Sequence, residues 1–253
     1  MKIEIKKEIM ADFLKKAGFG KLFDDVHITV NEKSINAVGA DKTRTVFYNL
    51  HLEEGQGLKI QSAGSMNIQQ IASKAMKVID SFDEDILIGT SPDGEILIKD
   101  KVKQAKLESC DDKLVTTWNS VAGNETMFNR SDLSLKGNKY TNGIKISMGT
   151  LVNMVKDANN LNFEFYKFSY NLKKKTLTGK VEAGRNVIQT NIAIKEQAGL
   201  LTEIDHLISD GFRDIVEAIK NSCKEVWMFF EENSVLVTDK KSFYYILVAE
   251  KGE

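Results

Sequence analysis

The sequence offers few residues suited to catalysis or to metal binding. Its three histidines, His27, His51 and His206, are widely spaced, and none lies at metal-ligand spacing from another histidine or a cysteine. The two cysteines, Cys110 and Cys223, can form neither a disulfide framework nor a metal-binding quartet. We therefore expect no metal site, no cofactor and no enzymatic activity.

Two other patterns with catalytic potential have simpler explanations. Gly18-Phe19-Gly20-Lys21 has the look of a phosphate-binding loop, but no Ser or Thr follows the lysine and the first glycine is misplaced, so a helix end is the better interpretation. The acidic pairs Asp83-Glu84 and Glu53-Glu54 lie at expected turns, where a solvated surface explains them. The sequence also contains no nucleophile-elbow, zinc-protease or C-x-x-C motif.

The remaining chemical signal is charge on the polar sides of four predicted helices: three of these faces carry more basic than acidic residues, and the fourth, at Ser209–Ser222, is balanced or slightly acidic. Lysine and arginine side chains on such a surface contact phosphates without reading bases. An ordinary solvated helix face has a similar composition, so both interpretations remain open from the helix positions alone. The basic residues concerned are Lys15, Lys16, Lys74, Lys77, Lys156, Arg213 and Lys220.

The four helices are predicted from an apolar stripe with i, i+3, i+4, i+7 spacing. They are expected at Met10–Ala17, Asn67–Asp80, Gly149–Asn160 and Ser209–Ser222. Alternating or β-branched runs between them predict strands, which short turn signals separate. The predicted strands are 24–31, 33–40, 44–53, 85–90, 95–100, 162–171, 176–183, 187–196, 225–231, 234–239 and 242–249.

These elements repeat along the chain. The first helix recurs as the third, the second helix as the fourth and the last strand group of the first half as that of the second, each with an offset of about 140 positions. We interpret this as a tandem duplication of an α+β unit of about 110 residues. Coincidence of two helices in each half is the alternative.

The composition narrows the class of protein. The 253 residues are 42% hydrophobic, which suffices for a core, and they carry 35 basic against 36 acidic residues for a net charge of −1. No apolar run reaches the roughly 18 residues of a membrane span, and the start of the chain lacks the apolar stretch of a secretory signal. We therefore expect an intracellular protein without membrane contact. The near-zero charge does not exclude nucleic acid, because it does not tell where the charges lie.

A long polar segment, Cys110 to Thr141, joins the two predicted units. It is rich in Asp, Asn, Ser, Thr and Gly, yet it contains Trp118, Phe128, Leu133 and Leu135. Connections longer than about 12–15 residues are often functional. A plain linker with a few docked side chains is the alternative.

Several stretches, taken in order and spacing, carry a resemblance to a known family. They are Phe13-Leu14-Lys15-Lys16, Lys33–Val38 with Thr45-Val46, Ser73–Lys77, Leu133–Leu135 with Tyr140, Val155-Lys156-Asp157, and Tyr244–Val248. Together they resemble the sliding clamps of the proliferating cell nuclear antigen (PCNA) family of eukaryotes and archaea over nearly the whole chain. Two departures stand out: 109–130 is longer than the family's usual connecting loop, and Val248-Ala249 replaces the usual Ala-Pro.

The resemblance implies an α+β fold made of two tandem sliding-clamp units, with helices on one face of antiparallel sheets. It places clamp repeat 1 at 1–109, the interdomain connecting loop at 110–141 and clamp repeat 2 at 142–253. Three copies would close into a ring of six units whose helices line a central hole. The seven basic helix residues named above would face DNA in that hole.

The resemblance also implies two further surfaces. A pocket for short partner peptides would be lined by Val38, Val46, Leu133, Leu135, Tyr245 and Leu247. Neighbouring subunits would pair through the edges 102–109 and 187–196, with Val102, Ala105, Leu107, Ile188, Ile192 and Ile194 at the interface.

The implied function is that of a homotrimeric DNA sliding clamp, a polymerase processivity factor in DNA replication and repair. Its partners would be duplex DNA, a DNA polymerase, a clamp loader, peptide-motif proteins such as a nuclease or a ligase, and further copies of itself. It would reside inside the cell with the DNA. This is the cytoplasm or nucleoid, or the nucleus if the protein is eukaryotic or comes from a nuclear virus. The alternatives are a clamp-like subunit of a heteromeric replication or checkpoint ring, a duplicated α+β enzyme with a cryptic site, and a scaffold that binds peptides but no DNA.

Overall fold

The computed structural model describes residues 1–19, 25–40, 45–55, 57–109, 128–163, 165–201 and 204–251. The chain forms two compact units, the first made of Met1–Asp41 and Tyr48–Glu125, the second of Lys42–Phe47 and Thr126–Glu253. Most of the connecting segment, including Cys110 and Trp118, lies outside the described residues, as do Gly20 and Lys21.

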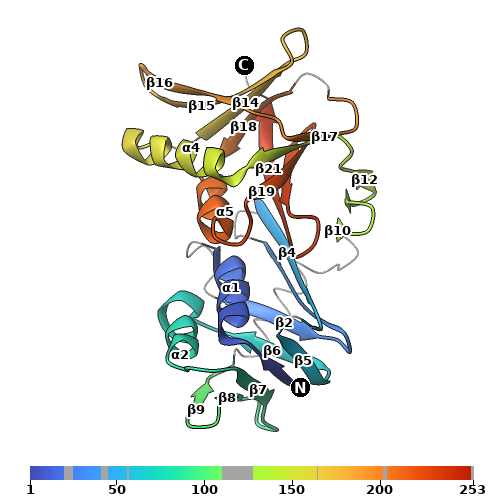
Figure 1. The fold of residues 1–253 in the computed structure, drawn as a ribbon, viewed down its shortest axis with the longest axis vertical. Helices are drawn as coiled ribbons and strands as arrows, with labels where there is room; N and C mark the ends of the chain where they lie inside the picture. Colours follow the sequence, from blue (N-terminus) through green and yellow to red (C-terminus); the bar gives the residue numbers. More distant parts are fainter. Residues whose placement is uncertain are drawn as a thin grey trace. The chain divides into compact units, whose positions relative to one another are not determined.

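The first unit is built on antiparallel sheets (Figure 1). One sheet has the strand order β5-β1-β7-β8-β9, and a second run has the order β6-β2-β3-β4. Its elements are β1 (Lys2–Ile5), α1 (Lys7–Gly18), β2 (Val26–Val30), β3 (Ser34–Ala40), β4 (Val46–Glu53), β5 (Leu58–Ser62), β6 (Gly64–Ile68), η2 (Ile71–Ala75), α2 (Met76–Asp80), β7 (Ile86–Thr90), β8 (Ile96–Lys99) and β9 (Gln104–Leu107).

The second unit has the continuous strand order β16-β15-β14-β18-β21-β20-β19-β13-β17 and a small separate sheet β10-β11-β12. The long strand β21 makes the connection, because Tyr244–Val248 pair with β20 while Ala249–Lys251 pair with β18. The elements are β10 (Phe128–Asn129), β11 (Ser134–Leu135), β12 (Asn138–Lys139), β13 (Gly143–Ser147), α4 (Met148–Leu161), β14 (Phe165–Asn171), β15 (Thr176–Ala183), β16 (Asn186–Ile192), β17 (Glu196–Ala198), β18 (Ile204–Ser209), α5 (Gly211–Ile219), β19 (Glu225–Glu231), β20 (Ser234–Thr238) and β21 (Phe243–Lys251).

The two units have the same topology. Among the described residues, from β1 and from β13 onward, each has one strand, a helix, five strands, a helical segment and three strands. The order β5-β1-β7-β8-β9 corresponds strand by strand to β17-β13-β19-β20-β21, and β6-β2-β3-β4 corresponds to β18-β14-β15-β16. The predicted α+β duplication is therefore confirmed, and β9 is the counterpart of β21, as β4 is of β16.

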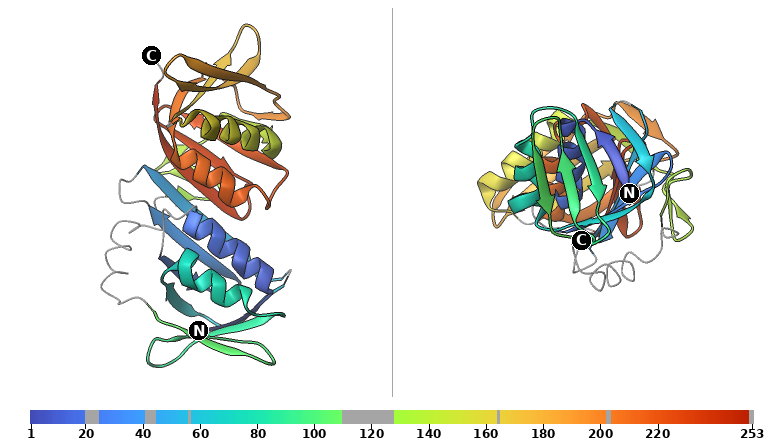
Figure 2. Two further views of the ribbon diagram at one scale, coloured as in Figure 1. Left: turned by 90° about the vertical axis from the view of Figure 1, so that its left-hand side faces the viewer. Right: turned by 90° about the horizontal axis from the view of Figure 1, so that it is seen from below.

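Each core lies between the sheets and a pair of helices. In each unit the two helices pack side by side on one face of the strands, α1 with α2 and α4 with α5 (Figure 2). Alternate strand residues point to this face, so β2 and β15 show a strict period of two in burial. In the second unit the ring of Phe212 from α5 lies edge-on to Tyr166 and Phe168 of β14, at centroid distances of 5.0 and 5.4 Å.

The predicted helices are present, but their ends differ. The first begins at Lys7 instead of Met10, and the fourth is Gly211–Ile219 because Ser209 belongs to β18. The second begins at Ile71 instead of Asn67, because Gly64–Ile68 pairs with β2 as strand β6. Its first turn, η2, is a π-helix that follows Gln70 at a positive φ of 50°. The sequence patterns also missed the short strands β5 and β13 and the buried strand β18, whose alternation is too brief or too weak to stand out.

Gly39 of β3 provides a test of this packing. A Cβ added there would lie 2.4 Å from the ring of Tyr48, which is fully buried on β4. We expect Gly39→Ala to lower the free energy of unfolding by about 1–3 kcal/mol, because the ring must move. Urea denaturation measures this change.

Gly89→Ala is the matched control. Gly89 is also in a strand, but the nearest atom to its added Cβ is the carbonyl oxygen of Met1 at 3.5 Å, an ordinary contact. The free energy of unfolding of the Gly89→Ala variant should differ from that of the unmodified protein by no more than about 0.5 kcal/mol. Equal losses in the two variants would contradict the packing of Tyr48.

Candidate functional site

Three of the seven basic helix residues have unneutralised charges. Lys77 on α2 and Lys156 on α4 are exposed, and Lys15 on α1 is half-buried. None of the three forms an ion pair with a described residue. They are the side chains best placed to contact an anionic ligand from the helical face.

The other basic helix residues except Lys16 are paired to acids nearby. Lys74 approaches Glu108 at 3.8 Å, and Lys220 bonds to Glu217 one turn earlier on the same helix region. Arg213 lies 3.8 Å from Asp210 and 3.5 Å from Asp214. The polar side of α5 is therefore locally compensated, as expected for a helix with balanced charge.

Burial acts on the acid beside Arg213. Asp214 is about half-buried, and the loss of water raises the pKa of its carboxyl group above the usual range, while the neighbouring guanidinium opposes the rise. The 3.5 Å approach of this carboxyl group to the Arg213 guanidinium leaves only part of the arginine charge available to a ligand.

Lys16 is placed differently from the expectation. Its side chain is buried, and its Nζ lies 2.6 Å from the Asp12 carboxylate one turn earlier on α1. The i, i+4 spacing that suggested an exposed basic pair also brings Lys16 to the acid on its own helix. The prediction that Lys16 faces a ligand is therefore wrong, and the residue acts inside the first unit.

The second unit has a hydrophobic cluster under the end of the connecting segment. Phe128, the first residue of β10, and Tyr140, directly after β12, pack on one face of β19, β20 and β21. The cluster contains Phe128, Tyr140, Phe229, Leu236, Tyr244 and Ile246, with Phe47, Leu133, Leu135, Ala198 and Trp227 packed against it. Leu133 and Leu135 are thus docked apolar side chains in a polar segment.

Two specific contacts fix this segment. The ring of Phe128 lies 5.2 Å from that of Tyr244, and the Tyr140 hydroxyl is 2.8 Å from the Ser234 hydroxyl. Burial raises the pKa of Tyr140 to about 12, so its hydroxyl remains protonated at neutral pH. The segment is therefore anchored at both ends of its small sheet.

On β21 and β4, the residues that belong to or pack on the cluster are the chain neighbours of those predicted to line the peptide pocket. Tyr244 and Ile246 face Leu133 and Leu135, whereas Tyr245 and Leu247 are fully buried on the opposite face of β21. Successive strand residues point to opposite faces, so a one-residue error in register exchanges the whole set.

The same shift occurs at β4, where Phe47, and not the buried Val46, packs against the cluster. Val38, the other predicted pocket residue, is half-buried on β3 of the first unit. The structure therefore places Val46, Tyr245 and Leu247 in the core, whereas their neighbours Phe47, Tyr244 and Ile246 belong to or pack on the cluster with Leu133 and Leu135.

Sequence reasoning also missed the stacked aromatic pair Trp227 and Phe229 on β19. Trp227 and Phe229 stack with centroids 5.7 Å apart, and Lys240 lies over the indole ring at 3.6 Å from its centroid. A Cβ at Gly143 on the neighbouring strand would lie 2.4 Å from the Phe229 ring, so the ring lies directly over the glycine. The alternation of the predicted strand 225–231 was the available signal.

The two predicted interface segments are sheet edges. β9 ends the order β5-β1-β7-β8-β9 and β16 ends the order of the second unit. Val102, in the turn before β9, is 87% exposed, and Val187 on β16 is 52% exposed. Of the predicted interface residues, Ala105 and Ile188 are half-buried, Leu107 and Ile192 are buried within their own units, and Ile194 lies just after β16.

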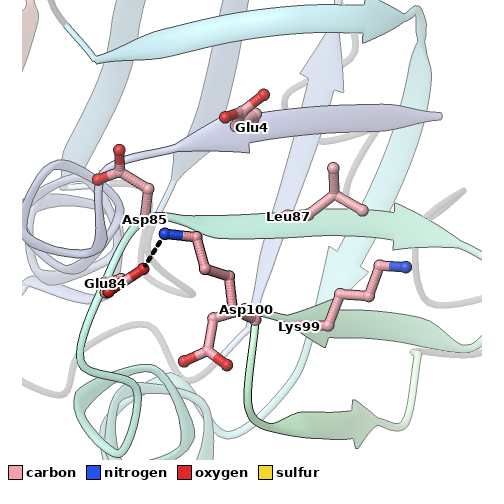
Figure 3. Close-up of a pocket in the computed structure, with 7 residues that line it drawn as sticks. Glu4, Glu84, Asp85, Leu87, Lys99 and Asp100 are labelled. Atoms are coloured by element: carbon pink, nitrogen blue, oxygen red, sulfur yellow. Dashed lines mark ion pairs between the residues drawn. The ribbon is translucent and has the colours of Figure 1, made fainter.

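An open hollow of about 600 Å³ lies on the first unit (Figure 3). It is lined by Glu4, Glu84, Asp85, Leu87, Lys99, Asp100 and Lys101. Lys101 pairs with Glu84 at 3.0 Å, and backbone N–H groups of Lys103 and Val102 lower the pKa of Asp100. Asp100 therefore does not have the raised pKa that a general acid needs near neutral pH.

The histidines are separate and structural. His27 bonds to the Asn67 side chain at 2.6 Å, His51 to that of Asn36 at 2.7 Å, and buried His206 to the Glu231 carbonyl at 2.6 Å. Within the described ranges, no three or more His, Cys, Asp or Glu side chains are grouped to hold a metal ion. No described helix has the length and apolar character needed to cross a membrane.

Comparison with solved structures decides the fold. The chain matches PCNA from Thermococcus kodakaraensis with a TM-score of 0.72 and 15% identity, over 98% of this chain and 100% of that one. It matches A. fulgidus PCNA, bound to the C-terminal region of FEN-1, with a TM-score of 0.75 and 10% identity, over 100% and 99% of the two chains.

The chain has the sliding-clamp fold. It also covers 65% of the DNA polymerase sliding clamp from Bacillus subtilis, with all of this chain aligned, a TM-score of 0.68 and 12% identity. No protein-family model and no curated protein sequence matches the chain. The sliding-clamp fold is therefore visible in the arrangement of strands and helices and not in residue identity.

The position of Lys16 can be tested by stability. We expect Lys16→Gln to lower the free energy of unfolding by about 1–3 kcal/mol, because it removes a buried charge-assisted contact and leaves Asp12 without this partner. Lys15→Gln, one position away on the same helix, should change it by less than about 0.5 kcal/mol. Urea denaturation compares the two, and equal effects would contradict the structural role of Lys16.

Proposed function

We propose that this protein is a DNA sliding clamp, a non-enzymatic processivity factor that encircles duplex DNA as a trimeric ring. In this proposal residues 1–109 and 142–253 are the two clamp repeats and 110–141 is the connecting loop. The protein works with the DNA inside the cell and tethers a polymerase and other DNA enzymes, such as a nuclease or a ligase, after a clamp loader has placed it.

The pairing of β21 is the observation that carries the proposal. Residues 45–47, at the start of β4, belong to the second unit and add to the edge of β21, where Val248 N–H donates to the Thr45 carbonyl at 2.8 Å. The counterparts of β4 and β21 in the duplicated topology are β16 and β9, and both end their sheets.

If β16 of one copy paired with β9 of the next, as residues 45–47 pair with β21, the backbone N–H and C=O groups at both edges would be hydrogen-bonded. Unpaired edges invite pairing with another chain, and a head-to-tail contact of this kind generates a closed ring when its rotation closes. Exposed Val102 and Val187 lie at these two edges, where such a contact would cover them.

The helical faces support weak contact with DNA. Lys15, Lys77 and Lys156 form no ion pair within the described part of the chain, whereas Arg213 and Lys220 are compensated. A closed ring stays on DNA because of its topology, so a few screened phosphate contacts suffice and permit sliding. The net charge of −1 suits such a protein.

The cluster under the connecting segment is the proposed docking site for partner peptides. Leu133 and Leu135 cover an apolar face made of Phe47, Tyr244 and Ile246. Aromatic and aliphatic walls under a surface segment suit a small apolar anchor from a partner.

A subunit of a heteromeric ring is the second candidate. The same edges would then meet two different chains, and the PCNA2-PCNA3 complex from Sulfolobus tokodaii, matched with a TM-score of 0.72 and 9% identity over 99% of both chains, shows two such proteins together. Ring assembly of the purified chain by itself separates this candidate from the homotrimer.

The solution mass of the pure protein tests the ring. Light scattering at micromolar concentration should give about three times the 28.4 kDa of one chain. The double variant Val102→Asp, Val187→Asp should shift it toward a single chain, because charge is placed at both edges. Leu200→Asp, at a residue that is 84% exposed away from β9 and β16, should keep the trimer.

A single-chain mass for the unmodified protein would contradict the homotrimer, and recovery of a threefold mass on mixing with a paralogous chain would establish the heteromer.

Processivity tests the assignment of the helical face. We expect Lys15→Glu, Lys77→Glu and Lys156→Glu together to shorten the products of loader-dependent primer extension by about tenfold or more, since three phosphate contacts become repulsive. Light scattering should still report a trimer. The matched control replaces Lys33, Lys59 and Lys99, which are exposed outside the helices, with Glu. Equal shortening in both variants would contradict the assignment.

A further inference from the structure

The strongest concentration of positive charge lies away from the helical face. Residues 165–192, which form β14, β15 and β16, contain six basic residues and one acid, Glu182, in a chain of net charge −1. The basic residues are Lys167, Lys173, Lys174, Lys175, Lys180 and Arg185. Such an asymmetry within a near-neutral chain indicates an anionic partner.

The tip of the β14–β15 hairpin presents three consecutive lysines to solvent. Asn171 pairs with Thr176, so Leu172 to Lys175 form the turn, and all four residues are exposed. The Lys174 N–H donates to the Asn171 side chain at 2.9 Å, and Lys175 has a positive φ of 52°. The turn is therefore defined by its backbone, and none of its lysines forms an ion pair with a described residue.

The same charge continues along one face of the sheet. Lys167 and Lys180 are directly opposite each other on β14 and β15, an arrangement of like charges that costs stability unless an anion offsets it. Asp205 on β18 lies 3.2 Å from Lys167, but Lys180 has no ion pair with any described residue.

This face is opposite to the core. The alternate residues Tyr166, Phe168 and Leu177 are buried, and α4 packs against the other side of β15 and β16 (Figure 1). Within the second unit the lysine face is therefore not covered by the helix, and it is separate from the helical face proposed to contact duplex DNA.

Exposed apolar side chains accompany the lysines. Phe165, on the same face as Lys167, is 41% exposed, and its ring is supported edge-on by Phe163 at 6.5 Å. Leu172 at the hairpin tip is 49% exposed. Phe165 is at the end of β14 away from the hairpin tip, on the same sheet face as Lys167 and level with Glu182 on β15. An accessible aromatic ring on a lysine-bearing sheet face fits a nucleic acid whose bases are unpaired, because a base can stack on the ring while phosphates follow the lysines toward the tip. A duplex offers no free base face.

We propose that the outer face of β14 and β15, with its tri-lysine hairpin, binds single-stranded nucleic acid. Phosphates contact Lys173, Lys174 and Lys175 and then Lys180, and a base stacks on Phe165. The site does not depend on ring assembly, so it goes beyond the proposed clamp function and stands or fails separately from it.

Fluorescence anisotropy with a labelled 30-nucleotide single strand and the matching 30-base-pair duplex tests this site on the full-length protein. We expect tighter binding of the single strand at 0.1 M salt. Lys173→Gln, Lys174→Gln and Lys175→Gln together should weaken that binding by between about tenfold and 100-fold and reduce the slope of log K against log salt by about 2, since each single-strand contact contributes about 0.7. The control triple Lys33→Gln, Lys59→Gln, Lys99→Gln should leave the slope unchanged.

Phe165→Leu isolates the stacking contact. It keeps an apolar side chain of similar exposure, and it should weaken single-strand binding by about fivefold or more while leaving duplex binding unchanged. Unaltered affinity in the tri-lysine variant, or an equal loss in the control triple, would overturn the site. Tighter binding of the duplex, or binding of labelled poly-glutamate without binding of the single strand, would also overturn it. Circular dichroism confirms that each variant is folded.

Discussion

Open sheet edges are the constraint on which the rest of this structure depends. A strand at the end of a sheet leaves backbone N–H and C=O groups unpaired, and these groups must meet water or another strand. The chain satisfies one such edge internally, where residues 45–47 add to β21. Because the chain is a duplication, the counterpart strands β9 and β16 end the sheets of the described residues, and Ser109, just after β9, forms only an isolated bridge with Ile68. Under the proposed function, pairing of these two edges between copies would close a ring.

Charge is distributed to suit weak and reversible contacts. On the helices, several cations are compensated by acids one turn away or across the surface, as for Lys16 with Asp12 and Lys220 with Glu217. Under the proposed function, a ring that slides on DNA would gain little from strong attraction, so such compensation is consistent with weak phosphate contact. Among the described residues, Lys173, Lys174, Lys175 and Lys180 of β14, β15 and their turn also have no ion pair, and Lys180 lies on the sheet face opposite to the core.

The connecting segment and the outer sheet face form one packed surface in the second unit. Phe128 and Tyr140 anchor the segment over β19, β20 and β21, and Trp227 with Lys240 extends the surface beside it. Apolar residues of a polar segment are therefore accounted for by docking, and the same docked surface is the one proposed to receive partner peptides. Positioning of the segment and recognition of partners are thus linked through the same side chains.

The sequence by itself determined the elements and their duplication, because the periods of 3.6 and 2 are local properties of the chain, as in the stripe of α4 and the alternation of β15. The tertiary structure decided which side of a strand each residue faces and which charges remain free. Tyr244 and Tyr245 are adjacent and alike in composition, and only the pairing of β21 places Tyr244 under the connecting segment and Tyr245 in the core. Likewise Lys15 and Lys16 are the same residue type at adjacent positions, but the helical geometry of α1 buries Lys16 beside Asp12. A one-residue slip in strand register moves every side chain to the other face of the sheet, and only long-range packing selects between the two registers.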